Sequence, residues 1–167
     1  MKTLWEIMSW VSQKERFAKI EDYIEFSKYY LEFISVELQA EIIAQNENNY
    51  CFFQYKRDGE YNITRPVNGD LFLSLSDYES IARNFETTLE HIRDIKDDEL
   101  NRKYVNDFIY TTQQSIGCAL DALPSSKTNT SRKVNGDLFE RLMQLIMKKL
   151  GFVIESETLC VKVPNST

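Results

Sequence analysis

The sequence predicts an α+β protein that is mainly helical. Apolar residues recur at intervals of three and four over most of the chain, which is the spacing of amphipathic helices. Three short strand-like runs, separated by Asp-Gly and Asn-Gly pairs, lie together between residues 50 and 75. We therefore expect a helical body with a small antiparallel meander over residues 1–123. A linker at 124–131 and the helix–strand–strand start of a second, incomplete unit over 132–167 are expected to follow.

The first two predicted helices carry a wide apolar surface. Residues 3–14 have the spacing of a short amphipathic helix, and residues 17–45 form the longest periodic segment. Two adjacent apolar rows run along this segment: Ile20, Ile24, Leu31, Ile34, Leu38 and Ile42 in one, and Tyr23, Phe26, Tyr30 and Phe33 in the other. Such a wide face predicts a central helix packed on two neighbours. A dimer interface is the alternative, because symmetric dimers are common.

The predicted meander follows these helices. Residues 50–57 are aromatic and strand-like, and Asp58-Gly59 is a hairpin turn signal. Residues 60–64 are then expected to form the second strand of the hairpin. Asn68-Gly69 marks a second turn, after which residues 71–75 alternate as a third strand would. The aromatic side chains of the first strand could stack on nucleic-acid bases, but packing in the core is the favoured interpretation.

Two further helices are expected before the linker. Residues 76–79 have the Ser-x-x-Glu form of a capping box, and one helical face follows over residues 78–92. Acidic residues 97–99 suit the first turn of the next helix, which Pro124 ends. We expect these two helices to form an antiparallel hairpin.

The stretch after the linker has the signals of a capped helix. Asn135 is a good N-cap, Asp137 suits the first turn, and Gly151 is the expected residue after the helix end. The predicted buried stripe is Phe139, Leu142, Met143, Ile146 and Leu150. Residues 152–154 and 159–163 read as strands. The hexapeptide Val-Asn-Gly-Asp-Leu-Phe occurs at 67–72 and 134–139, and its flanks predict a turn in the first copy and a helix start in the second.

The charge of the chain is unevenly distributed. The net charge is −6, which argues against a protein that coats nucleic acid with its whole surface. Residues 1–100 carry a net charge of −9 and residues 101–167 a net charge of +3, concentrated between Lys127 and Lys149. This basic stretch is either a solvated helix face or a binding surface.

The remaining composition excludes several kinds of site. Cys51, Cys118 and Cys160 lie far apart, which predicts buried free thiols in a reducing cytoplasm rather than disulfides or a zinc site. We see no signal peptide and no apolar run long enough to span a membrane. With His91 as the single histidine, Ser-His-Asp hydrolases and His-rich metal sites are disfavoured.

One motif resembles a known enzyme family. The pattern Arg132-Lys133-x-x-Gly-Asp-x-Phe-Glu, an apolar helix ending Leu-Gly-Phe, and a Val-x-Val-Pro strand are similar to the opening of a nuclease core. This core is that of type II restriction endonucleases of the PD-(D/E)XK superfamily. The resemblance implies that Glu140 is a supporting catalytic carboxylate. It also implies that the basic stretch contacts DNA, with Lys127, Arg132, Lys133, Asn135 and Arg141 as the candidate residues.

The chain departs from this family in its catalytic residues. The family's chemistry needs an Asp on one strand and a (Asp/Glu)-x-Lys on the next, which hold Mg²⁺ and activate water. No Glu-x-Lys occurs here, no Asp follows Glu140, and the single Asp-x-Lys, at residues 94–96, lies upstream at a predicted helix end. The resemblance therefore implies the N-terminal portion of a Mg²⁺-dependent deoxyribonuclease, inactive alone, which binds duplex DNA as a homodimer. In that enzyme, residues 1–123 would serve dimerisation or enclose the DNA.

The alternative is a non-enzymatic helical domain for protein–protein interaction. In that case the wide apolar face of residues 17–45 would bind the partner.

Overall fold

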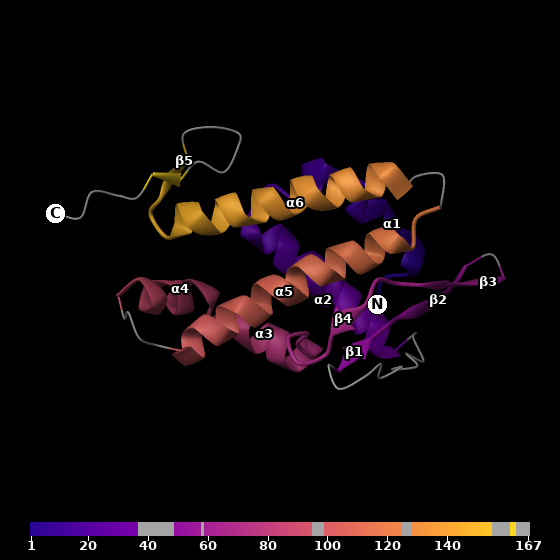
Figure 1. Cartoon of the computed structure of the whole chain (residues 1–167), viewed down its shortest axis with the longest axis horizontal. Helices are drawn as coiled ribbons and strands as arrows, with labels where there is room; N and C mark the ends of the chain where they lie inside the picture. The colour runs from indigo at the N-terminus through magenta and orange to yellow at the C-terminus, as the bar shows by residue number, and fades with distance from the viewer. Residues whose placement is uncertain (37–48, 58, 95–98, 125–127, 155–160, 163–167) are drawn as a thin grey trace.

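The structure is a computed structural model that describes residues 1–36, 49–57, 59–94, 99–124, 128–154 and 161–162. Its described residues form a mainly helical α+β fold, as the sequence predicts (Figure 1). The helices are α1 (Leu4–Val11), α2 (Ile20–Val36), α3 (Leu75–Arg83), α4 (Phe85–Asp94), α5 (Glu99–Asp121) and α6 (Thr128–Lys149), with a 3₁₀ turn, η1 (Lys14–Arg16). The strands are β1 (Tyr50–Cys51), β2 (Gln54–Arg57), β3 (Glu60–Ile63), β4 (Val67–Asn68), β5 (Val153–Ile154) and β6 (Val161–Lys162).

Helix α5 is the centre of the fold and packs against α1, α2, α3, α4 and α6. Phe108 of α5 stacks on one ring from each of two neighbouring helices. Its ring centroid lies 5.0 Å from that of Tyr78 in α3 and 4.2 Å from that of Phe85 in α4. The Tyr78 hydroxyl also pairs with the Thr112 hydroxyl at 2.8 Å. Burial raises the pKa of Tyr78 because its charged form would lose contact with water. These contacts fix α3 and α4 against α5.

Most described residues of the two apolar rows predicted on the central helix are buried in α2, while Ile24 and Ile34 are half-buried. Ile20 and Leu31 of one row and Tyr23, Phe26 and Tyr30 of the other are at most 5% exposed. Leu38 and Ile42 lie outside the described residues. Most of the described part of this face therefore packs inside the chain, and the alternative of an external partner or a dimer on residues 17–45 stays a prediction.

The β2–β3 hairpin forms as predicted, with Gln54 opposite Ile63 and a left-handed Gly59 (φ +84°) in the turn. A third strand over residues 71–75 does not form, and β4 pairs with β1 instead. Residues 71–75 do not form a strand because they are bonded to Thr111 of α5, which is distant in the sequence. Its hydroxyl accepts from the Leu73 N–H at 2.8 Å and donates to the Leu71 carbonyl at 3.3 Å. This side chain satisfies the backbone groups that a strand partner would otherwise satisfy.

The helix predicted over residues 78–92 is in fact two helices, and its cap lies earlier than predicted. Ser74, not Ser76, is the N-cap of α3, because its hydroxyl accepts from the Asp77 N–H at 3.2 Å. Asn84 ends α3, and its carbonyl accepts from the Thr88 N–H within the first turn of α4. The apolar face continues across this break, since Tyr78 and Phe85 are both buried.

Helix α6 begins earlier than the sequence predicts. Residues 128–131, assigned to the linker, form its first turn, so Asn135 lies inside the helix and is not its N-cap. The second copy of the hexapeptide is also inside this helix. The fully buried stripe is Val134, Leu138, Leu142 and Ile146, while Phe139, Met143 and Leu150 are half-buried. Although α6 shares a core with α2 and α5, the division of the chain into two units stays a prediction.

The end of α6 matches the prediction. Gly151 adopts a left-handed conformation (φ +88°), and its N–H donates to Lys148 while the Phe152 N–H donates to Met147. This pair of bonds is a Schellman motif. The short β5–β6 antiparallel pair follows, with Ile154 opposite Val161.

Two of the cysteines agree with the prediction of buried thiols. Cys51 and Cys118 are buried and free, while Cys160 lies outside the described residues. Burial raises the pKa of the Cys118 thiol to about 12. Within the described ranges, no helix combines the length and the apolar character needed to cross a membrane.

Candidate functional site

The residues predicted to contact DNA do not form one surface. Arg132, Lys133 and Arg141 are exposed on α6, whereas Asn135 is half-buried and its side-chain oxygen has no partner among the described atoms. Lys127 lies outside the described residues. Arg141 comes nine residues after Arg132, which at 1.5 Å per residue is about 13 Å along the axis and on a different side of the helix. Arg132 and Arg141 therefore belong to two different sites.

One site is a hollow of about 390 Å³ beside the middle of α6. It is lined by Glu140, Arg141, Asp137 of α6 and Lys14 of η1. Arg141 donates to the Phe17 carbonyl at 3.4 Å, and Glu140 accepts from Gln144 at the same distance. Lys14 and Asp137 form an ion pair. Two cations and two carboxylates thus offset each other, and their contacts hold α6 against η1.

This ion pair leads to a prediction about acid stability. The hydrogen bond from Lys14 holds the pKa of Asp137 below its usual value. A carboxylate with a lowered pKa stabilises the fold above its unfolded pKa of about 3.9, and this contribution is lost as the pH falls through the folded pKa. We expect Asp137→Asn to lower the urea midpoint at pH 6, and the difference from the unmodified protein to shrink below about pH 4. A difference that stays constant over this range would contradict the assignment.

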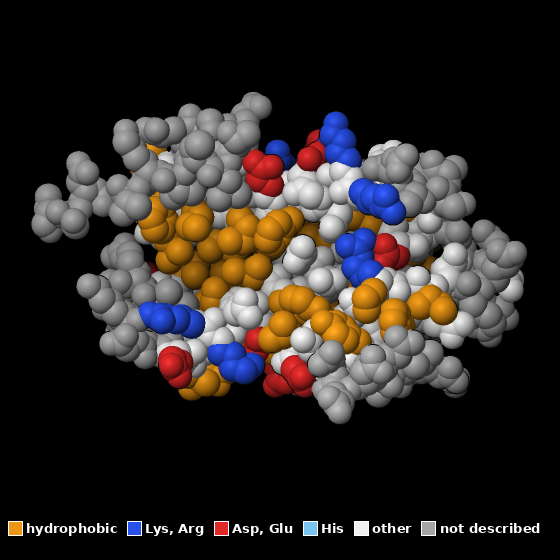
Figure 2. Space-filling view, viewed as in Figure 1, with side chains coloured by type: hydrophobic (Ala, Val, Ile, Leu, Met, Phe, Trp, Pro, Cys, Tyr) orange, Lys and Arg blue, Asp and Glu red, His pale blue; other side chains and the backbone are white. Residues whose placement is uncertain are grey.

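The other site is a hollow of about 490 Å³ where α5 ends and α6 begins. Its lining includes Ile63, Thr64, Arg65, Asp121, Ser131 and Arg132. The base of the β2–β3 hairpin, the end of α5 and the first turns of α6 therefore meet here. Figure 2 shows Lys and Arg side chains over the N-terminal part of α6 and the adjoining end of α5. The largest group of hydrophobic side chains in this view lies between the C-terminal half of α6 and α5.

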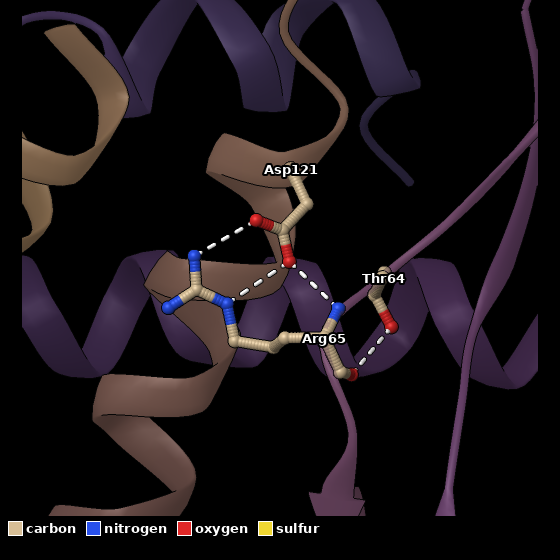
Figure 3. A network of polar contacts seen from close by, with 3 residues as sticks. All are labelled: Thr64, Arg65 and Asp121. Carbon is tan, nitrogen blue, oxygen red and sulfur yellow. Dashed lines mark hydrogen bonds and ion pairs between the residues drawn. The ribbon is translucent and has the colours of Figure 1, made fainter. Parts of the chain in front are cut away.

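Arg65 and Asp121 form the polar centre of this hollow (Figure 3). The Arg65 side chain donates through Nε and Nη2 to the Asp121 carboxylate at 2.9 and 2.8 Å. The Arg65 backbone N–H donates to the same carboxylate at 2.9 Å. The side-chain hydrogen bonds to Asp121 raise the pKa of Arg65 above its usual value. The forked geometry fixes the plane of the guanidinium, as bidentate Arg–carboxylate pairs do.

Gly117 of α5 makes room for this guanidinium. A Cβ atom at position 117 would lie 2.6 Å from Arg65 Nη1 and 2.7 Å from Cζ. Sequence reasoning identified none of these three residues, since Arg65 and Asp121 are 56 positions apart. The one signal available was a glycine inside a predicted helix, which costs stability unless packing requires it.

Mg²⁺, which the resemblance implies, does not fit the described residues. They contain no group of three or more Asp, Glu, His or Cys side chains that could hold a metal ion. Asp137 is paired with Lys14, and Glu140 with Gln144.

Comparison with solved structures shows a restriction-endonuclease-like fold. The crystal structure of the type IIP restriction endonuclease Kpn2I matches with a TM-score of 0.59 at 22% sequence identity. The match covers 92% of this chain and 50% of the endonuclease, so the chain spans about half the length of that protein. No protein-family model matches the sequence, and no curated protein matches it significantly.

Proposed function

We propose that this chain is the N-terminal, DNA-binding region of a type II restriction endonuclease of the PD-(D/E)XK superfamily. The observation that carries the proposal is the fold similarity to Kpn2I over 92% of the chain. The exposed Arg132 and Lys133 near the start of α6 support a role in DNA binding, since exposed cations on one surface neutralise phosphates. The buried free thiols Cys51 and Cys118 suit an enzyme of the cytoplasm.

The test of DNA binding is a pair of charge-matched double variants. We expect Arg132→Ala with Lys133→Ala to weaken binding to duplex DNA and to lower the slope of log K against log salt by about 2. The control is Lys19→Ala with Lys148→Ala, which removes two exposed cations elsewhere. Fluorescence anisotropy with a labelled duplex, over a salt series, measures both quantities. Equal effects of the two pairs, or no duplex binding by the unmodified chain, would contradict the proposal.

In this proposal the catalytic carboxylates and the Mg²⁺ they hold come from polypeptide outside this chain. The sequence supports this because it has no Asp after Glu140 and no Glu-x-Lys. We expect the purified chain to leave plasmid DNA uncut in the presence of Mg²⁺. Cleavage that Glu140→Gln abolishes would show that Glu140 has a primary catalytic role, against this expectation.

The homodimer is part of the same proposal. Most of the described face of α2 is used in the core, and the exposed side of α1, which carries Trp5 (75% exposed), offers a second surface for a dimer. Sedimentation equilibrium of the unmodified chain and of Trp5→Ala tests this. A monomer at all concentrations would remove the dimer from the proposal.

A further inference from the structure

The hollow at the start of α6 differs in charge from three other hollows of the described surface. Its lining has two arginines and one carboxylate, a net charge of +1. The hollow beside Glu140 is neutral, and those between α2 and α3 and between α4 and α6 each have a net charge of −1. Of the four, this hollow is therefore the one whose electrostatics favour an anion.

Arg65 lines this hollow, and its guanidinium is already oriented by Asp121. Asp121 occupies Nε and Nη2, and Nη1 makes no hydrogen bond with a described residue. Figure 3 shows the third guanidinium nitrogen pointing away from Asp121. Because the carboxylate fixes the guanidinium plane, little side-chain entropy remains to be lost when Nη1 binds an acceptor. Arg132 adds a second, exposed cation to the same lining.

We infer that this hollow binds a backbone phosphate of duplex DNA, with Arg65 and Arg132 as its ligands. The inference rests on the proposed function and deepens it, since it places one phosphate of the DNA beside the base of the β2–β3 hairpin. A phosphate monoanion matches the single excess positive charge, and arginine is the side chain that best fits phosphate geometry. Free inorganic phosphate has the same chemistry, so the test must separate the two sources.

The sharpest test changes the rim of the hollow and leaves Arg65 intact. Ile63 lines the hollow and is 59% exposed, while Val153 of β5 is 61% exposed and does not line it. Ile63→Glu places a carboxylate beside the bound phosphate, and Val153→Glu makes the same change of charge at equal exposure elsewhere. We expect Ile63→Glu to weaken duplex binding by roughly tenfold and to lower the salt slope by about 1, with Val153→Glu unchanged. Ile63→Arg is expected to strengthen binding.

The outcomes separate this inference from the proposed function. If the Arg132/Lys133 double variant loses duplex affinity but Ile63→Glu and Ile63→Arg do not change it, DNA binds α6 outside the hollow. In that case the inference fails and the proposed function stands. If the chain binds no duplex, yet inorganic phosphate raises its melting temperature and Ile63→Glu removes this effect, the hollow takes free phosphate and both assignments to DNA fail. Circular dichroism of each variant confirms that its fold is retained.

Discussion

Phe108→Ala is expected to lower the free energy of unfolding by about 3–5 kcal/mol, because it removes a ring from the centre of the core. Phe108 is fully buried and stacks between the rings of Tyr78 and Phe85. The cavity would lie where α3, α4 and α5 meet, so two helices would lose their shared contact on the third. Urea denaturation followed by circular dichroism measures the change.

Tyr104→Ala is the matched control for this prediction. Tyr104 lies one turn earlier on the same helix and is 39% exposed. Its replacement removes a ring of similar size and changes helix propensity in the same direction, so it separates burial from propensity. We expect the loss to be about 0.5 kcal/mol. Equal losses in the two variants would show that Phe108 does not hold the core as the structure indicates.

The helices were predictable because their burial follows local periodicity. Tyr23 and Tyr30 of α2, like Leu142 and Ile146 of α6, are spaced at intervals that place them on one face whatever packs against them. The Schellman end of α6 was equally local, since Gly151 alone signals it. Patterns of this kind predict a helix or its end from a few neighbouring residues, without knowledge of the tertiary contacts.

The secondary-structure predictions were wrong where a contact with a distant side chain determines the backbone conformation. Residues 71–75 alternate like a strand, yet Thr111 of α5 satisfies their backbone groups. Residues 128–131 have the polar, small composition of a linker, yet they form the first turn of α6, in which Ser131 is buried. The candidate site shows the same limit: Arg132 was identified by its motif, whereas Arg65 enters the site only through contacts that the tertiary fold creates.

Asp121→Ala is expected to cost about 2–3 kcal/mol, which is large for a residue at the surface. The substitution removes the acceptor of the Arg65 backbone N–H, of Nε and of Nη2 together. Both side chains are partly exposed, at 32% for Arg65 and 24% for Asp121, so water reaches the freed donors and the cost stays below that of a fully buried pair. Arg65→Ala should cost less, because the backbone bond to Asp121 remains. Urea denaturation of the two single variants and the double variant measures the coupling between the residues.

Gly117→Ala tests the contact between Arg65 and α5, because its effect on stability is expected to change sign when Arg65 is removed. Alanine is favoured over glycine inside a helix by about 1 kcal/mol, so the substitution alone should stabilise α5. In the unmodified protein, however, the new Cβ would lie 2.6 Å from Arg65 Nη1. The guanidinium cannot move aside without breaking its bonds to Asp121, so we expect a net loss of stability. In the Arg65→Ala background the obstacle is gone, and the same substitution should become stabilising. A stabilising effect in both backgrounds would mean that Arg65 is not held against α5 by Asp121, and the oriented donor proposed for the phosphate would be lost with it.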